Sequence, residues 1–332
     1  MIFSWGLISL RDGDRWTNIR PPSQSKYAYA TILTSEGDIE YPNVQEPYLH
    51  AARLLTYQLL HDPRTRGNNT DIPLLVLVTE DVPQRHRDIL KNDGATVVPV
   101  HNVSREWIHP KWERWSGVLA KLNLWNLVEY DKIMFLDADT VIFRPIEHIF
   151  ESPTTAPQQT LPWTTIISNG TVYNSSIDDA AAGPLPETYM IAGIHDIWVE
   201  WALPPVPGND FYAPQNYMNA GFFMCSPSKN LSEYYLSLLD IPNRFDSNYP
   251  EQNLLNNAHR TDGRMPWRDL GPGWNQKGAD KAAYDGGLRS IHHKWWRHLE
   301  DEFLTHYIAN AMGDMDEYFF ERDQHLLFPN YA

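Results

Sequence analysis

The sequence from Lys132 to Thr140, KIMFLDADT, joins a short apolar run to two carboxylates. The apolar residues Ile133 to Leu136 predict a buried strand of a parallel sheet. Asp137 and Asp139 follow with one small residue between them, so their side chains point to the same side of an extended chain. Carboxylates this close repel each other unless a cation neutralises them, and oxygen ligands suit Mn²⁺ or Mg²⁺. This stretch therefore predicts a divalent-metal site at the end of a buried strand.

Strand and helix patterns alternate along the chain before this site. Apolar, β-favouring segments predict strands, and apolar spacings of three and four residues predict helices. The expected strands are 27–33, 72–78, 95–100 and 132–136, and the expected helices are 47–60, 82–92 and 115–130. This order predicts the α/β class, with a mostly parallel, twisted central sheet and helices on both of its faces. Ligands of such sheets bind beyond the carboxyl ends of the strands, where the two aspartates lie.

The second half of the chain begins with a change of composition. Residues 151–188 are rich in Pro, Thr, Ser and Gly, which predicts a surface insertion or lid. Beyond it we expect strands over 219–225 and 288–292, and helices over 228–239, 251–259 and 297–320. We therefore expect an N-terminal arm, 1–26, and a single domain, 27–332. Its nucleotide-binding half, 27–145, and its acceptor-side half, 146–332, would share one sheet.

The composition argues against several classes of protein. A net charge of −15 argues against a nucleic-acid partner, because phosphate binding needs a basic face. Cys225 is the only cysteine, so no intrachain disulfide forms, and no apolar run is long enough to span a membrane. As it stands the chain is expected in the cytoplasm, whereas sequons such as Asn68 and Asn102 would suit the Golgi lumen if an N-terminal anchor is missing. The aromatic side of the last helix would suit a homodimer.

Several motifs around the aspartates match one known family. WSGVLAKLNLW at 115–125 precedes YDKIMFLDAD at 130–139, and together they resemble family 8 glycosyltransferases, the glycogenin-like group. Further matches follow in order: NAGFF at 219–223, EQNLLN at 251–256, Trp274-Asn275, Ile291-His292 and Lys294-Trp295. The early segments Pro47-Tyr48 and 62–66 are similar to the fungal N-acetylglucosaminyltransferase-like branch. This resemblance implies a GT-A-type catalytic domain.

The resemblance also implies a metal and a donor. Asp137 and Asp139 would hold Mn²⁺, with Mg²⁺ as the other option, and His292 would be the third protein ligand. The donor would be a UDP-sugar, and Lys121 would reach its diphosphate. The expected donor contacts are Thr34 and Tyr48 at the uracil, the latter by stacking, together with Lys121, Asp137, Ala138, Asp139 and Lys294.

The implied reaction is transfer of a hexose or N-acetylhexosamine with retention of configuration, to an acceptor that the sequence does not name. Asn219 and Gln252 would line the reaction centre, and Lys294 would neutralise charge on the leaving diphosphate. No carboxylate pair marks a nucleophile, so we favour front-face substitution, with a covalent route through Glu251 as the weaker alternative. The expected catalytic residues are thus Lys121, Asn219, Glu251, Gln252 and Lys294.

Two features depart from the family pattern. Glu251 stands where the family usually has Asp, and the interval from His292 to Lys294 is short and lacks a glycine. The sequence also leaves two other functions open. One is a haloacid-dehalogenase-like phosphatase with Asp137 as nucleophile and Asp139 as acid, and the other is a non-catalytic carbohydrate-binding protein.

Overall fold

The computed structural model describes residues 25–34, 46–162, 164–166, 172–174, 182–196, 216–276, 279–296 and 301–327. The expected N-terminal arm, 1–26, lies almost wholly outside these residues. Much of the expected insertion over 151–188 lies outside them as well, so its role as a lid stays a prediction.

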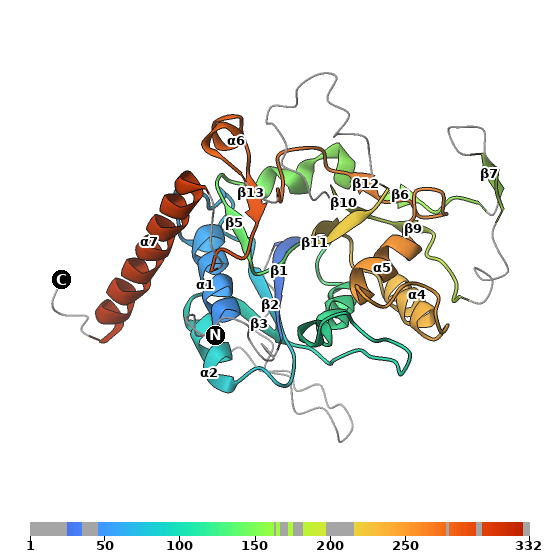
Figure 1. Ribbon diagram of the computed structural model, residues 1–332, viewed down its shortest axis with the longest axis horizontal. Coiled ribbons are helices and arrows are strands. Elements are labelled where there is room, and N and C mark those ends of the chain that lie inside the picture. Colours follow the sequence, from blue (N-terminus) through green and yellow to red (C-terminus); the bar gives the residue numbers. More distant parts are fainter. Residues whose placement is uncertain are drawn as a thin grey trace, which may run out of the picture.

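A seven-stranded sheet forms the centre of the molecule, with the strand order β12-β10-β11-β4-β1-β2-β3 (Figure 1). Its first four strands along the chain are β1 (Tyr27–Leu33), β2 (Leu74–Val78), β3 (Thr96–Pro99) and β4 (Lys132–Leu136). These four pair in parallel, as β3-β2-β1-β4. The expected α/β class with a mostly parallel central sheet is confirmed.

The second half of the chain completes the same sheet. β11 (Met218–Cys225) pairs antiparallel with β4, and β10 (Ile191–His195) pairs antiparallel with β11. β12 (Arg268–Asp269) pairs in parallel with β10 and forms the edge. Two successive reversals make β10 run in the same direction as β4, so both strands end at the same edge of the sheet.

Helices cover both faces of this sheet (Figure 1). On one face lie α1 (Pro47–Leu60) and α2 (Gln84–Asn92), which pack against every second residue of β1, β2 and β4. On the other face lie η2 (Val118–Asn126), α4 (Lys229–Leu239) and α5 (Pro250–Ala258), packed against the alternate residues. The two cores follow from the alternation of side chains along a strand, which buries both faces of a central strand.

The segment expected as one helix over 115–130 folds instead as two 3₁₀ helices, η1 (Glu113–Trp115) and η2. Leu119, Leu122 and Trp125 are all buried and follow one another at intervals of three. A 3₁₀ helix has three residues per turn, so it keeps these three side chains on one face where an α-helix would rotate them apart. The face expected at Val118, Leu122 and Trp125 was correct for the last two residues, but Leu119 is buried where Val118 is only half-buried. The expected helix type was wrong.

A smaller layer lies beside α1. β5 (Thr140–Ile142) and β13 (Ser290–His292) pair antiparallel, and α7 (Glu302–Leu327) packs against them and against α1. The last helix was expected from 297, but the Asp301 side chain accepts a hydrogen bond from the Leu304 N–H (2.8 Å) and caps a helix that begins at Glu302. Among the described helices, none is long and apolar enough to cross a bilayer.

The remaining elements are short. They are η3 (Glu147–Glu151), η4 (Pro153–Thr155), β6 (Gln158–Gln159), β7 (Thr164–Ile166), β8 (Val172–Asn174), β9 (Thr188–Tyr189) and α6 (Lys281–Asp285).

Candidate metal and donor site

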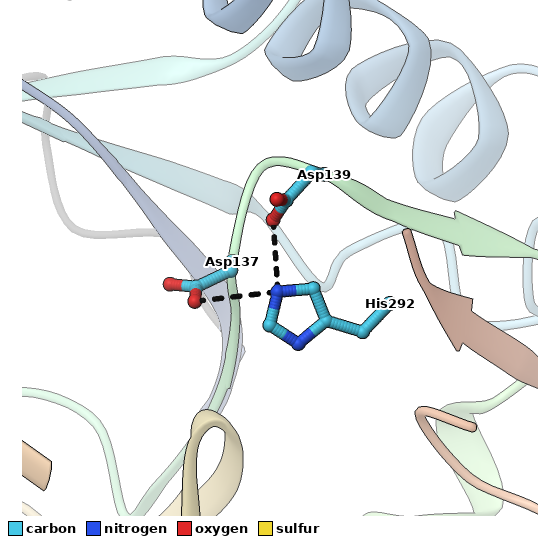
Figure 2. Close-up of side chains that lie close together, drawn as sticks. All are labelled: Asp137, Asp139 and His292. Atoms are coloured by element: carbon cyan, nitrogen blue, oxygen red, sulfur yellow. Dashed lines mark ion pairs between the residues drawn. The ribbon is translucent and has the colours of Figure 1, made fainter. Parts of the chain in front are cut away.

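Three side chains that suit a metal ion meet at the carboxyl end of β4. Asp137 and Asp139 follow the strand directly, and His292 ends β13. His292 Nε2 lies 3.1 Å from Asp139 Oδ1 and 3.7 Å from Asp137 Oδ2 (Figure 2). One ligand atom from each residue fits within 4.8 Å of the others. Two carboxylate oxygens and one imidazole nitrogen form a donor set that fits Mn²⁺ better than Mg²⁺, which strongly prefers oxygen alone.

Backbone pairing holds these three residues together. His292 is the partner of Thr140 in the β5–β13 ribbon, so it lies beside the residue that follows Asp139. The Asp137 N–H donates to the carbonyl of Gly221 in β11 (2.7 Å). The sheet and the ribbon therefore fix the ligands from two directions, and a strand-end position alone would not bring His292 near the aspartates.

Asp139 is held as an anion although it is buried. Burial alone would raise the pKa of its carboxyl, but the positive charge of His292 and that of Lys294 outweigh this and lower its pKa to about 2. A carboxylate that stays ionised at every physiological pH is ready to bind a cation.

Gly221 lies against the three ligands. A Cβ atom at this position would lie 2.6 Å from Asp137 Oδ2 and 2.6 Å from His292 Cε1. Both atoms belong to the candidate metal ligands, so any side chain larger than that of glycine would displace these ligands.

Gly221→Ala is therefore expected to weaken Mn²⁺ binding by about 10- to 100-fold, the usual cost of disturbing the supports of metal ligands. The affinity can be measured by electron paramagnetic resonance of free Mn²⁺. Gly313→Ala is a matched control, because a Cβ there meets nothing within 4 Å. Unchanged Mn²⁺ affinity in Gly221→Ala would show that these ligands do not bind the metal as a group.

Lys121 forms the link between the metal ligands and α5. Its ammonium contacts Asp137 Oδ1 (2.9 Å), Glu251 Oε1 (3.1 Å) and the Ala220 carbonyl (3.2 Å), and its side chain is buried. Burial opposes the charge of Lys121, but Asp137 and Glu251 more than offset this and raise its pKa, so it remains protonated. An ammonium has three N–H donors, and these contacts use all three. These contacts suit a role for Lys121 in positioning Asp137 and Glu251, and its expected contact with the diphosphate stays a prediction.

A second carboxylate group lies next to these residues. Asp196 follows β10, and it accepts hydrogen bonds from Asn219 Nδ2 (3.0 Å) and Gln252 Nε2 (3.0 Å). Gln252 also accepts from the Ala220 N–H (3.0 Å), which fixes the orientation of its amide. Asn219 Oδ1 accepts from Gly221 N–H and from Asn275 Nδ2. The two expected amides are therefore brought together, and the acid that orients both is Asp196.

Sequence reasoning missed Asp196, although a signal for it exists. Residues 191–195 are a fully buried strand, and an aspartate follows directly. This is the same pattern that identifies Asp137 after β4. The strand contains a glycine and a histidine, so its apolar character is weaker and the pattern is harder to see.

The other expected donor contacts lie around the same pocket. Lys294 Nζ donates to Tyr48 Oη (2.8 Å) and lies 5.4 Å from the centre of its ring. Burial and the nearby Arg114 lower the pKa of Lys294, while Asp139 and Asp137 act in the opposite direction. The ring of Tyr48 meets Trp296 edge-on, at 5.0 Å between ring centres. Thr34 directly follows β1 and also lines the pocket.

The pocket has a volume of about 620 Å³ and joins all of these groups. Every expected site residue lines it: Thr34, Tyr48, Lys121, Asp137, Ala138, Asp139, Asn219, Glu251, Gln252, His292 and Lys294. The lining also contains residues that were not expected from the sequence: Lys111, Trp112, Arg114, Trp115, Asp196 and Tyr249. One pocket thus contains the candidate metal ligands and the amides that surround Asp196. Three aromatic residues, Trp112, Trp115 and Tyr249, also line it and are called the aromatic wall below.

Comparison with known proteins assigns this arrangement to a family. The profile of Glycosyl transferase family 8 matches residues 44–311, which include β4, β11, α5 and β13. The chain belongs to glycosyltransferase family 8. As a member of this family it is a nucleotide-sugar-dependent transferase with a GT-A-type fold, and this agrees with the parallel sheet and with the site at the end of β4.

Relatives of this family 8 glycosyltransferase occur in fungi and plants. An uncharacterized protein of Schizosaccharomyces pombe is 26% identical, with 87% of this chain and 80% of the relative covered. Galactinol synthase 2 of Solanum lycopersicum is 24% identical, with 87% of this chain and 85% of the relative covered. Mouse xyloside xylosyltransferase 1, solved in its apo form, superposes with a TM-score of 0.46 at 11% identity, covering 80% of this chain and 97% of that one.

Proposed function

We propose that this family 8 glycosyltransferase is a retaining, Mn²⁺-dependent enzyme that transfers a hexose or N-acetylhexosamine from a UDP-sugar. The observation that carries the proposal is the group of Asp137, Asp139 and His292 in the pocket that also contains Lys294 and Asp196. Among the two sugar classes, the galactinol synthases named as relatives favour a hexose.

The proposed roles follow from the contacts. Asp137, Asp139 and His292 would hold the metal, which when bound neutralises charge on the donor diphosphate. Lys294 would add a second positive charge to the leaving group. Lys121 would fix Asp137 and Glu251, and Thr34 and Tyr48 would receive the uracil. The amides of Asn219 and Gln252, both oriented by Asp196, would bind hydroxyl groups of the donor sugar.

Front-face substitution fits this arrangement best. The bond between the anomeric carbon and the β-phosphate oxygen breaks, and the acceptor oxygen bonds to the anomeric carbon on the same face. The acceptor proton passes to the leaving phosphate oxygen, so no protein base is needed. Glu251, the candidate for a covalent route, is committed to an ion pair with Lys121 (3.1 Å), which lowers its value as a nucleophile.

The alternatives have less support. A phosphatase would use Asp137 as a nucleophile, but Asp137 Oδ1 is in an ion pair with Lys121 (2.9 Å). A binding protein without catalysis would not need three metal ligands beside a lysine at the same pocket. Membership of family 8 argues against both.

The proposal is tested by incubating the protein with Mn²⁺ and, separately, UDP-glucose, UDP-galactose and UDP-N-acetylglucosamine. We expect slow release of UDP by transfer to water from one donor, which identifies the sugar, and the first anomer of the released sugar should be that of the donor. No release of UDP from any of the three, combined with hydrolysis of a simple aryl phosphate, would contradict the proposal and favour the phosphatase.

Asp196→Asn gives a test of the sugar subsite. Asp196 accepts from Asn219 and Gln252 with different oxygens. Asparagine replaces one of these oxygens with an NH₂ group, so one of the two amide donors loses its acceptor and should turn away. Loss of a hydrogen bond to a charged group costs about 1.5–3 kcal/mol, so UDP release should slow by about 10- to 100-fold while UDP itself binds normally. Asp285→Asn, at an exposed ion pair on α6, is the control. If the affinity for UDP falls by the same factor as the rate of UDP release, Asp196 supports the nucleotide and not the sugar.

A further inference from the structure

Arg114 is a cation in the pocket for which the functions assigned so far give no role. It lies in η1, just before the segment that contains Lys121, and its side chain lines the pocket. The guanidinium carbon lies 5.1 Å from the ring centre of Trp112 and 5.3 Å from that of Trp115. Two aromatic rings thus hold the guanidinium, an arrangement that favours a cation without neutralising it.

The charge of Arg114 has no carboxylate partner among the described residues. Its Nε atom is buried and makes no hydrogen bond to any part of the chain that the structure describes. By contrast, Lys121 is neutralised by Asp137 and Glu251. A buried donor of a charged group costs free energy when it stays unpaired, so this position suits an anionic ligand.

The surroundings of η1 place Arg114 on the donor side of the pocket. Gly117 lies against Thr34 at the end of β1, because a Cβ on Gly117 would come within 3.0 Å of the Thr34 side chain. The ring of Trp115 packs against Tyr249, at 5.0 Å, directly before α5. Arg114 and Lys294 line the same pocket as the metal ligands. Two cations therefore face the space between the end of β1 and the metal ligands.

We propose that Arg114 binds the diphosphate of the nucleotide-sugar donor, as a second protein cation beside Lys294. The planar guanidinium can donate two parallel hydrogen bonds to phosphate oxygens, and the rings of Trp112 and Trp115 fix its plane beforehand. This inference rests on the proposed function, since it requires a UDP-sugar donor. It adds a residue that positions the diphosphate and that the motifs of the sequence did not identify.

The test measures the affinity of the protein for UDP, UMP and uridine in the presence of Mn²⁺ by calorimetry. Arg114→Gln removes the charge of the side chain and leaves a shorter, uncharged polar group. We expect UDP to bind about tenfold more weakly to Arg114→Gln, with a smaller loss for UMP and none for uridine. Arg114→Lys should regain part of the affinity for UDP, because it restores the charge without the planar pair of donors. Arg105→Gln, which breaks an exposed ion pair with Asp240 outside the pocket, is the control.

The outcomes separate this inference from the function on which it rests. If the wild-type protein binds UDP and Arg114→Gln binds it equally well, the inference is wrong. An equal loss for uridine and UDP in Arg114→Gln would also overturn it, because Arg114 would then support the base site. If the wild-type protein binds no UDP at all, the proposed function itself fails.

Discussion

Replacing Asp139 with asparagine is expected to slow Mn²⁺-dependent release of UDP by about a thousandfold, because a bound metal supplies several kcal/mol of charge stabilisation to the leaving diphosphate. Asp139 is buried and its carboxylate lies 3.1 Å from His292 Nε2, so an amide at this position removes both the charge and one oxygen ligand. The rate can be followed by a coupled UDP assay with the preferred donor.

Asp131→Asn is the matched control for this experiment. Asp131 lies at the opposite end of β4, is exposed and pairs only loosely with Lys26 (3.7 Å). Its substitution should leave the rate within about twofold, as is usual for exposed ion pairs. A normal rate in Asp139→Asn would contradict the role of Asp139 as a metal ligand, and a large effect in both variants would indicate loss of the fold.

Lys294→Gln should lower kcat by about 100- to 1000-fold with a much smaller change in KM, because the charge that Lys294 neutralises develops mainly in the transition state. Lys294 Nζ is held by Tyr48 Oη, at 2.8 Å, so it points to a defined place before the donor arrives. Steady-state kinetics with the preferred donor separate the two parameters.

Tyr48→Phe shows how much of this effect depends on positioning. It removes the hydroxyl that Lys294 contacts and leaves the aromatic ring and its contact with Trp296. We expect a loss of kcat that is small beside that of Lys294→Gln. If Lys294→Gln raises KM and leaves kcat unchanged, Lys294 binds the donor in the ground state and does not stabilise the leaving group.

The nucleotide-binding half could be predicted from the sequence because its strands are short, continuous apolar runs. β1 and β4 were placed with their observed bounds, and α1 as well. β2 begins two residues later than expected, at Leu74, because Pro73 precedes it. At these two boundaries, the start of β2 and the start of α7, a local feature overrides the apolar pattern: a proline in the first case and the Asp301 cap in the second.

The metal group could be predicted only with the help of the family motifs. The spacing of Asp137 and Asp139 points to a cation by itself, whereas His292 reaches them through the pairing of β5 with β13, which no local pattern shows. Asp196 has a local signal, because it follows a buried strand, but its place beside the metal group depends on the antiparallel course of β11 between β4 and β10. Long-range strand order, and not local propensity, brings these side chains to one edge of the sheet.

The position of the aromatic wall beside the metal ligands could not be predicted, because its residues lie in a very short helix and in loops that show no apolar pattern. Trp112, Arg114 and Trp115 belong to η1 and the residue before it, and their packing against Tyr249 joins two segments distant in the sequence. The contacts of Lys121 could not be predicted for a similar reason. Its position in the motif was identified correctly, but its three contacts depend on Glu251 and Ala220 from two other elements.

The most direct test of the central claim is a titration of the protein with Mn²⁺, with and without UDP, followed by electron paramagnetic resonance of the free ion. The proposed site predicts one bound Mn²⁺ per chain, tighter binding when UDP is present, and loss of this binding in Asp139→Asn. If Mn²⁺ does not bind with UDP present, or binds equally well to Asp139→Asn, then Asp137, Asp139 and His292 are not a metal site and the proposed mechanism is wrong.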